Sequence, residues 1–250
     1  MMPVTISCGA TEGVDWQDLS ACTFTEKMAV FRFYVANNTL IPNYIYTLLQ
    51  PDEHARAARY RRQDDHNRFV YGRAITKVII SKFTNHVPIA IQLVPGINNK
   101  PELAGIPDLY INLSHTANWI LLAVSRSSVG IDIEKIVFDF PFQDILQSSF
   151  SQEEQHYVET STDPAGEFYR LWTRKEALVK ATAKGMDDDF SRIPSLDGEH
   201  MTEPGLIGEP GLWTVTSFNV ADGYAAALAH KAGAEIPEFY TVESGLFDLP

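Results

Sequence analysis

The sequence predicts an α+β protein built as a pseudo-dimer, in which two similar halves enclose a ligand cleft. Short stretches of alternating apolar residues, typical of strands, are interleaved with longer stretches of helical periodicity. Both halves of the chain show a strand, then helices, then paired strands. The polar segment SRSS at residues 125–128 separates them, which predicts an N-terminal half at residues 1–126 and a C-terminal half at residues 127–250. A cleft between packed halves is a common place for a ligand.

After a weakly periodic and partly loose segment at residues 1–27, the first half alternates strand and helix. Pro51 followed by two acids favours a helix start, because proline suits the first turn and acids suit the positive end of the helix dipole. Apolar residues recur at helical spacing through residues 64–83. The predicted elements are strands at 28–35, 88–94, 110–113 and 119–125, helices at 42–49, 51–60 and 64–83, a loop at 96–107 and a turn at 114–118.

The second half is organised around one long helix. From Phe168 to Gly185 apolar residues recur near helical spacing, and Gly185 suits a C-terminal cap. Ser151 with Glu154 forms a capping-box pattern at the start of another helix. The predicted elements are strands at 129–136, 212–219 and 224–230, the last two forming a hairpin, helices at 142–148, 151–159 and 168–185, an irregular segment at 186–211, and a peripheral tail after 233.

Composition and charge narrow the class of function. The 250 residues are 45% hydrophobic and 11% aromatic, as expected of a globular protein. No apolar run is long enough to span a membrane and the N-terminus shows no secretory pattern, so we expect a cytoplasmic protein with Cys8 and Cys22 as free thiols. The formal net charge of −12 argues against nonspecific binding to nucleic acid. A self-contained cleft favours a monomer.

Positive charge is concentrated in one segment of this acidic chain. Seven of the 20 Lys and Arg residues lie between residues 56 and 77. Such a concentration suggests a ligand that carries phosphate, although a solvated helix face would give the same pattern. The residues are Arg56, Arg59, Arg61, Arg62, Arg68, Arg73 and Lys77.

Three carboxylates carry the candidate chemistry of the second half. Asp132 and Glu134 are two positions apart in a predicted strand, so both project from the same face. Glu176 and Lys180 are one turn apart on the long helix and share a face with Trp172. Carboxylate oxygens suit a hard cation such as Mg²⁺, and we expect the three acids to meet around one. The alternatives are an exposed strand face and an ordinary helix-stabilising Glu–Lys pair.

Together these motifs resemble the 4′-phosphopantetheinyl transferases of the long, two-half, surfactin-synthetase-activating type. The family pattern G-[IV]-D-[IV]-E is followed by [WF]-x-x-K-E-[AS]-x-x-K, and a Lys-Pro with a later N-[LI]-S-H precedes both. The resemblance runs from about Pro51 to Tyr224, whereas the short, trimeric carrier-protein synthases do not fit a chain of this length. The matching positions are Gly130, Asp132, Glu134, Trp172, Lys175, Glu176, Ala177, Lys180, Lys100-Pro101 and Asn112 to His115.

The resemblance implies a magnesium-dependent transferase. Family members move 4′-phosphopantetheine from coenzyme A to a serine of an acyl or peptidyl carrier protein and release 3′,5′-ADP. Asp132, Glu134 and Glu176 match the Mg²⁺ ligands, and Lys180 matches the lysine near the pyrophosphate. The residues that match contacts to coenzyme A are Arg56, Arg68, Lys100, Ser114 and His115. The carrier can belong to fatty-acid, polyketide or nonribosomal-peptide synthesis.

Two points stay open at the level of sequence. Glu176 is the nearest candidate for the general base on the serine hydroxyl, and a tight metal ligand does not easily serve as a base. Where the family often has a lysine three residues before Arg56, this chain has Glu53. The 3′-phosphate is then held by fewer cations, or by Arg59 or Arg62 instead.

Two other classes of protein use parts of the same pattern. A nuclease or nucleotidyl transferase also combines D-x-E with a distant glutamate, but it must bind a long polyanion, which a net charge of −12 disfavours. A non-catalytic binding protein can keep the fold without the reaction. The intact Asp132, Glu134, Glu176 and Lys180 argue against that alternative.

Overall fold

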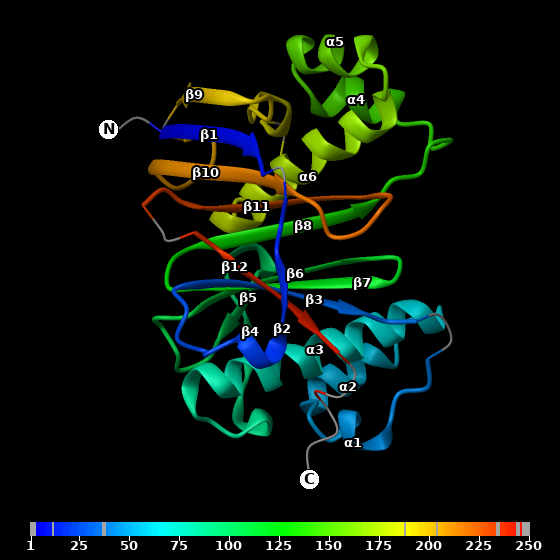
Figure 1. Cartoon of the computed structure of the whole chain (residues 1–250), viewed down its shortest axis with the longest axis vertical. Helices are drawn as coiled ribbons and strands as arrows, with labels where there is room; N and C mark the ends of the chain where they lie inside the picture. Colours follow the sequence, from blue (N-terminus) through cyan, green and yellow to red (C-terminus); the bar gives the residue numbers. More distant parts are fainter. Residues whose placement is uncertain are drawn as a thin grey trace.

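Two five-stranded sheets, each packed against a long helix, form the molecule (Figure 1). The computed structural model describes residues 4–11, 13–36, 39–187, 189–203, 205–233, 236–243 and 246. The sheets belong to two similar halves of mixed helix and strand, so the predicted α+β pseudo-dimer is confirmed. Within the described ranges, no helix is long and apolar enough to cross a membrane.

The sheet of the C-terminal half has the strand order β8-β11-β10-β1-β9. The hairpin of β10 and β11 is confirmed, and β11 pairs antiparallel with β8, the strand that carries the predicted acidic pair. The strands are β1 (Val4–Ala10), β8 (Val129–Lys135), β9 (Gly198–Thr202), β10 (Gly211–Phe218) and β11 (Tyr224–Lys231).

The sheet of the N-terminal half has the order β2-β12-β3-β7-β6, and a separate ribbon joins β4 to β5. Strand β6 lies at one edge of this sheet and contacts β8, the edge strand of the other sheet. The two halves therefore meet edge to edge. The strands are β2 (Trp16–Asp18), β3 (Met28–Tyr34), β4 (Leu93–Pro95), β5 (Pro101–Leu103), β6 (Tyr110–Thr116), β7 (Trp119–Ser125) and β12 (Glu238–Val242).

The two longest helices provide the apolar layers of the halves. Helix α3 buries Val70, Ala74 and Ile75 in the core of the first sheet's half, as its periodicity predicts, and α6 buries Ala177 and Leu178 against the second sheet. The helices are α1 (Asn43–Tyr46), α2 (Pro51–Ala57), α3 (Gln63–Thr84), α4 (Gln143–Ser149), α5 (Gln152–Thr160) and α6 (Pro164–Thr182), with 3-10 turns η1 (Leu19–Ala21), η2 (Pro88–Ala90), η3 (Ile97–Asn99) and η4 (Phe190–Arg192).

The predictions for both ends of the chain were wrong. Strand β1, in the segment expected to be loose, pairs in parallel with β10 of the second sheet. Strand β12, in the tail expected to be peripheral, lies between β2 and β3 of the first sheet. The sheet of the C-terminal half thus contains the N-terminal strand β1, and the sheet of the N-terminal half contains the C-terminal strand β12. A division of the chain at residues 126 and 127 does not account for these two strands. Pairing partners so distant in sequence leave no local signal.

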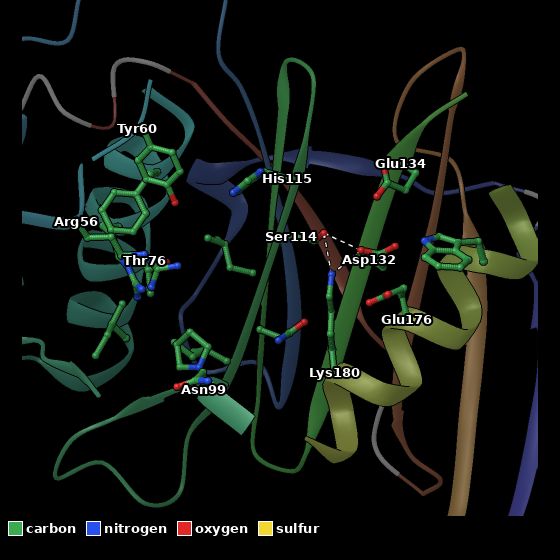
Figure 2. Close-up of a pocket in the computed structure, with 18 residues that line it drawn as sticks. Arg56, Tyr60, Thr76, Asn99, Ser114, His115, Asp132, Glu134, Glu176 and Lys180 are labelled. Atoms are coloured by element: carbon green, nitrogen blue, oxygen red, sulfur yellow. Dashed lines mark hydrogen bonds and ion pairs between the residues drawn. The ribbon is translucent and has the colours of Figure 1, made fainter. Parts of the chain in front are cut away.

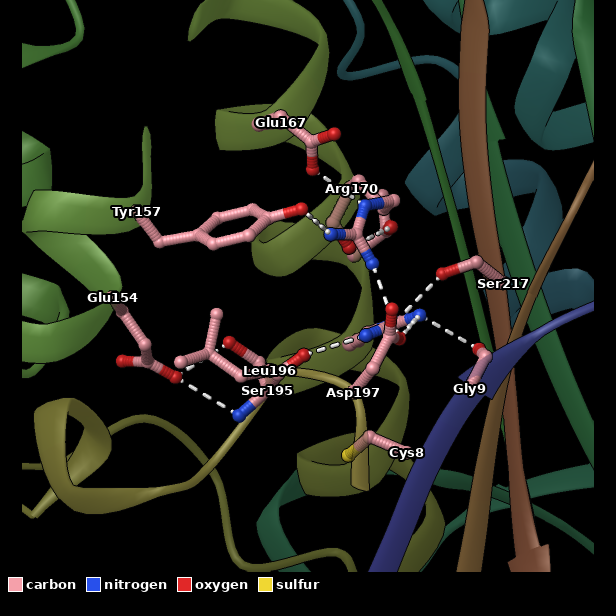
Figure 3. A network of polar contacts seen from close by, with 12 residues as sticks. Cys8, Gly9, Glu154, Tyr157, Glu167, Arg170, Ser195, Leu196, Asp197 and Ser217 are labelled. Carbon is pink, nitrogen blue, oxygen red and sulfur yellow. Dashed lines mark hydrogen bonds and ion pairs between the residues drawn. The ribbon is translucent and has the colours of Figure 1, made fainter. Parts of the chain in front are cut away.

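The buried Arg174 anchors β1 to the second half, and Figure 3 labels its partners Gly9, Ser195, Asp197 and Ser217. The Arg174 guanidinium on α6 donates hydrogen bonds to Gly9 O, Ser195 O and Ser217 Oγ, each at 2.7 Å, and pairs with Asp197 Oδ1 at 2.7 Å. Its charge is therefore matched by a carboxylate, and donors on each of its nitrogens are satisfied, which is the condition for burying a guanidinium. The network fixes β1, β10 and the 195–197 segment around α6.

Three internal predictions also need correction. Strand β6 continues through Thr116, so Ser114 and His115 lie in a strand rather than in a turn. The turn is shorter than expected because Ala117, with φ of 45°, adopts the left-handed conformation that reverses the chain at once. Residues 88–90 form a 3-10 turn before β4, and the irregular segment 186–211 contains β9.

Tyr240 provides a test of how much β12 contributes to stability. Its side chain is fully buried, stacks on Phe31 and donates to Glu238 Oε2 at 2.6 Å. We expect Tyr240→Ala to lower the free energy of unfolding by about 3–5 kcal/mol in urea titrations, the usual cost of removing a buried aromatic ring. The matched control is Tyr110→Ala on β6, where the ring is 40% exposed and the cost should be about 1 kcal/mol. A loss for Tyr240→Ala no larger than that for Tyr110→Ala would show that the buried ring on β12 contributes little to stability.

Candidate active site

A cavity of about 410 Å³ lies between the two halves (Figure 2). Residues of α2 and α3 from the first half form part of one wall, and residues of β8 and α6 from the second half form the other. Cations from α2 and α3 lie at one end of the cavity and carboxylates at the other. Its charged and polar lining consists of Arg56, Tyr60, Arg73, Thr76, Asn99, Asn112, Ser114, His115, Asp132, Glu134, Glu176 and Lys180.

Close packing of α6 on β8 brings the three predicted carboxylates to one end of this cavity. At Gly130 a Cβ atom would lie 2.0 Å from Ala177 O and 2.3 Å from Ala181 N, so only glycine allows the helix to approach this closely. Glu176 on α6 then faces Asp132 and Glu134 on β8 across the cavity wall. The side chains that strand and helix spacing place on one face, Asp132 with Glu134 on β8 and Glu176 with Lys180 on α6, all line this cavity.

Lys180 and Asp132 form the central ion pair of the site. Lys180 Nζ lies 2.6 Å from Asp132 Oδ1, and Ser114 Oγ donates to the same oxygen at 2.8 Å. Lys180 Nζ also donates to Ser114 Oγ at 3.2 Å, which closes a triangle of contacts between β6, β8 and α6. The other carboxylate oxygen, Asp132 Oδ2, is buried and has no hydrogen-bond partner in the described part of the chain.

Side chains of β6 tie the edges of the two sheets together. Asn112 Oδ1 accepts a hydrogen bond from Ile131 N at 2.8 Å, and Thr116 Oγ1 donates to Glu134 Oε2 at 3.1 Å. With Ser114 between them, these alternate residues form a row of polar contacts along β8. The row stands where backbone pairing would join two strands of one sheet, and it holds the acidic pair in place.

Burial, with repulsion from the neighbouring acid Asp132, raises the pKa of two of the carboxylates, Glu134 and Glu176. Burial, and then repulsion from Asp132, raise the pKa of Glu134 to about 7. Burial also raises the pKa of Glu176, and the Asp132 charge adds to the effect. Burial opposes the Lys180 cation, but the attraction of Asp132 outweighs it and raises the pKa of Lys180. Three acids thus share one lysine, and the site holds an excess of negative charge.

The carboxylate oxygens at this end of the cavity are ligands of the kind that a hard divalent cation prefers. Three carboxylates converge and one buried oxygen, Asp132 Oδ2, lacks a partner, as expected of a site for Mg²⁺. In the ranges that the structure describes, however, no three His, Cys, Asp or Glu side chains stand in an arrangement that would hold a metal ion. The other oxygen of Asp132, Oδ1, is paired with Lys180 in this arrangement.

The structure separates the residues expected to contact coenzyme A. Arg56, Ser114 and His115 line the cavity. Arg68 does not line it, because its guanidinium pairs with Asp65 and donates to Ala117 O at 2.6 Å. Burial lowers the pKa of His115, and the nearby Arg68 charge adds to that shift.

Lys100 lies outside this cavity and lines an adjoining one of about 290 Å³. Its ammonium donates to Val129 O at 3.0 Å and to Ala181 O at 2.9 Å. Burial lowers the pKa of Lys100 to about 8, against the attraction of Glu209 and Glu102. In this structure Lys100 therefore donates hydrogen bonds to backbone carbonyls of the second half.

Glu53, the departure from the family pattern, is part of a buried ion pair. Its Oε2 lies 2.7 Å from Nζ of the fully buried Lys77, and its Oε1 lies 3.7 Å from Arg73 Nε. The guanidinium groups of Arg56 and Arg73 lie over the Phe69 ring at 5.2 and 5.3 Å. Sequence reasoning named Arg73 only as part of the basic segment. Its helical spacing from Phe69 and Lys77 was the signal available for placing it on the cavity side of α3.

Comparison with known proteins agrees with this geometry. Residues 42–127 match the family described as "4′-phosphopantetheinyl transferase, N-terminal", and residues 128–229 match the "4′-phosphopantetheinyl transferase superfamily". The 4′-phosphopantetheinyl transferase psf-1 of Bacillus pumilus is 30% identical over 208 residues, which cover 79% of this chain and 86% of that protein. The chain belongs to the 4′-phosphopantetheinyl transferase superfamily. Its resemblance to the long, two-half type is confirmed.

Two further relatives show the extent of the similarity. The 4′-phosphopantetheinyl transferase Sfp of Bacillus subtilis is 26% identical over 204 residues, covering 79% of this chain and 88% of Sfp. A putative 4′-phosphopantetheinyl transferase, slr0495 of Synechocystis, is 29% identical over 159 residues, covering 62% of this chain and 64% of that protein. The residues that match the two family models, 42–127 and 128–229, include both walls of the cavity.

The Glu53–Lys77 pair makes a prediction about stability. Glu53→Gln keeps the shape of the side chain and an acceptor for Gln50 N, but it leaves the Lys77 charge buried without a counter-charge. We expect the free energy of unfolding in urea to fall by about 3 kcal/mol, the cost of breaking a buried pair on one side. The control Asp52→Asn, at the exposed neighbouring position, should stay within about 0.5 kcal/mol of the parent. A Glu53→Gln protein as stable as the parent would overturn the view that this buried ion pair needs both partners.

Proposed function

We propose that this protein transfers 4′-phosphopantetheine from coenzyme A to a serine hydroxyl of an acyl or peptidyl carrier protein and releases 3′,5′-ADP. The observation that carries the proposal is the single cavity with arginines from one half at one end and Asp132, Glu134, Glu176 and Lys180 from the other half at the opposite end. A ligand with separated phosphates suits such a cavity, because each phosphate requires its own compensation of charge.

The cationic end suits the 3′-phosphate of coenzyme A. Arg56 and Arg73 flank Phe69 there; Arg73 also lies 3.7 Å from Glu53 Oε1, whereas Arg56 has no ion pair among the described residues. They, rather than Arg59 or Arg62, would take the place of the family lysine that Glu53 replaces, because both line this cavity, whereas Arg59 lines an adjoining one. Ser114 and His115 lie between this end and the carboxylates, where the adenosine and the pyrophosphate would meet.

At the acidic end, Asp132, Glu134 and Glu176 would hold Mg²⁺. When bound, the ion would neutralise the pyrophosphate and stabilise the charge that develops on the leaving 3′,5′-ADP. Lys180 adds a second cation beside the same group, and its contacts with Asp132 and Ser114 fix its position. The chain itself thus supplies both the ligands and a permanent positive charge.

Of the three proposed Mg²⁺ ligands, Glu176 is the one least fixed by other side chains, so it would be the weakest ligand and the carboxylate that can also accept the proton of the serine hydroxyl, directly or through water. Asp132 and Glu134 are held by Lys180, Ser114 and Thr116, whereas Glu176 makes no hydrogen bond or ion pair with another described residue. In the transfer, the serine oxygen forms a bond to the phosphorus of phosphopantetheine, the bond from that phosphorus to 3′,5′-ADP breaks, and the proton passes to Glu176.

The first test uses coenzyme A, Mg²⁺ and an apo carrier protein. We expect the wild-type protein to raise the mass of the carrier by one phosphopantetheine, detected by intact-protein mass spectrometry. Asp132→Ala should abolish the transfer while retaining the circular dichroism spectrum, because the cation loses a ligand and Lys180 loses its partner. Asp222→Ala, in the exposed β10–β11 turn, is the matched control and should transfer normally. An unmodified carrier with the wild-type protein would refute the proposed function.

The second test concerns the arginines of the cationic end. Arg73→Ala should weaken coenzyme A about tenfold and leave 3′-dephospho-coenzyme A unchanged, because only the former has the phosphate that Arg73 is proposed to pair. Calorimetry measures both affinities. Arg68→Ala, outside the cavity, should not discriminate between the two ligands. The opposite pattern, discrimination by Arg68 and none by Arg73, would restore the assignment made from the family pattern.

A further inference from the structure

The loop of residues 96–101, here the capping loop, reaches from the first half to the C-terminal end of helix α6. A helix leaves its last four carbonyls without partners inside the helix, and α6 ends at Thr182 with Ala183 in the left-handed conformation. These carbonyls belong to the turn that begins at Lys180, so whatever satisfies them also fixes that end of the helix.

Two side chains of the capping loop satisfy two of these carbonyls. Asn98 Nδ2 donates to Ala183 O, the carbonyl of the C-cap residue, at 2.8 Å, and to Lys184 O, one residue past the cap, at 2.6 Å. Lys100 Nζ donates to Ala181 O at 2.9 Å and also to Val129 O at the start of β8. Partial negative charge accumulates at this end of a helix, so an amide donor and an ammonium are well suited to it. The helix is thus capped by the opposite half of the protein.

The backbone of the capping loop adopts a rarely populated conformation in this arrangement. Asn98 has φ of 49° and ψ of 34°, and Asn99 follows with φ of 62°, so two successive residues are left-handed. Asparagine tolerates that conformation better than most residues, but it still costs free energy. Tight packing accompanies it, since a Cβ added at Gly185 would lie 3.3 Å from Asn98 Nδ2.

The same loop borders the candidate active site. Asn99 and Pro101 line the cavity between the halves. Asn98 and Lys100 line the adjoining cavity, which they share with Glu176 and Lys180. The loop therefore contacts both the end of α6 and the space beside its functional residues, which no other capping interaction of this helix does among the described residues.

We propose that Asn98 is a positioning residue, which caps α6 from the opposite half and thereby sets the place of Lys180 and Glu176 over β8. It acts through the helix and touches no reacting group. Lys100 assists by linking the same helix end to β8. The capping role stands on the geometry alone, whereas its effect on catalysis rests on the proposed function.

The test compares glycine substitutions at two left-handed asparagines. Asn98→Gly removes both donated hydrogen bonds and keeps the backbone conformation, which glycine adopts readily. Asn85→Gly is the matched control, because Asn85 is the left-handed C-cap of α3 with φ of 56°, is exposed and makes no side-chain hydrogen bond within the described residues. Asn98→Asp keeps the size but turns a carboxylate toward the helix carbonyls.

Hydrogen exchange read by mass spectrometry gives the readout that is independent of activity. We expect Asn98→Gly to speed exchange of the α6 amides near Ala181 to Lys184 about tenfold, with Asn98→Asp faster still and Asn85→Gly unchanged. The melting temperature of Asn98→Gly should stay close to that of Asn85→Gly. Unchanged exchange in Asn98→Gly, or slower exchange in Asn98→Asp than in Asn98→Gly, would overturn the capping role.

Carrier modification then tests the catalytic consequence. We expect Asn98→Gly to lower kcat about tenfold with KM for coenzyme A changed less than twofold, because a displaced Lys180 weakens the transition state more than the bound substrate. An unchanged kcat together with faster exchange would reduce Asn98 to a structural cap and overturn the positioning role. A wild-type protein that modifies no carrier would instead refute the proposed function, and the exchange result would still stand.

Discussion

The edge-to-edge contact of β6 with β8 is the constraint on which the rest of the structure depends. Two sheet edges with free backbone groups lie side by side, and the polar side chains of Asn112, Ser114 and Thr116 connect them in place of a backbone ladder. Because β6 belongs to the first half and β8 to the second, this contact sets the distance between the cationic and acidic ends of the cavity. The Lys180–Asp132 pair lies at its centre, so the interaction that joins the halves is also the one that organises the site.

Glycine and helix packing explain why the acidic pair and α6 occur together in the sequence pattern. Gly130 allows the backbone of α6 to contact β8 directly, and any side chain there would push Glu176 and Lys180 away from Asp132. A strand with alternating acids and a helix with an acid and an amine one turn apart are both common alone. The close contact between them converts two weak signals into one site. The buried Arg174 also fixes the position of α6, because its guanidinium donates hydrogen bonds to β1 and β10.

The parts of the fold that the sequence predicted are those with local causes. Helices α3 and α6, the β10–β11 hairpin and strand β8 have strong periodicity or turn signals, and the acids of the site lie on these elements. Strands β1 and β12 depend on partners at the other end of the chain, so periodicity alone left them unassigned. The sequence showed that Glu53 stands where the family often has a lysine, but it did not show that Glu53 pairs with Lys77. Whether a charged side chain faces the cavity or the core depends on burial, and here both partners are buried. Lys100 is a similar case, since backbone carbonyls compete for its ammonium.

The distribution of charge between the halves has a consequence for stability. Arginines line the cavity from the first half and carboxylates from the second, so neither half holds the complete set of groups that a ligand with separated phosphates requires. A ligand bound across the cavity adds contacts to both sides of the interface, and by linkage it stabilises the closed arrangement of the halves by as much as that arrangement favours its binding. Strand β1 joins the sheet of the C-terminal half and β12 joins that of the N-terminal half, so the chain connects the two halves at both of its ends. Alignment of the cationic and acidic ends is therefore largely established before any ligand binds, and the cost of bringing them together falls on folding rather than on catalysis.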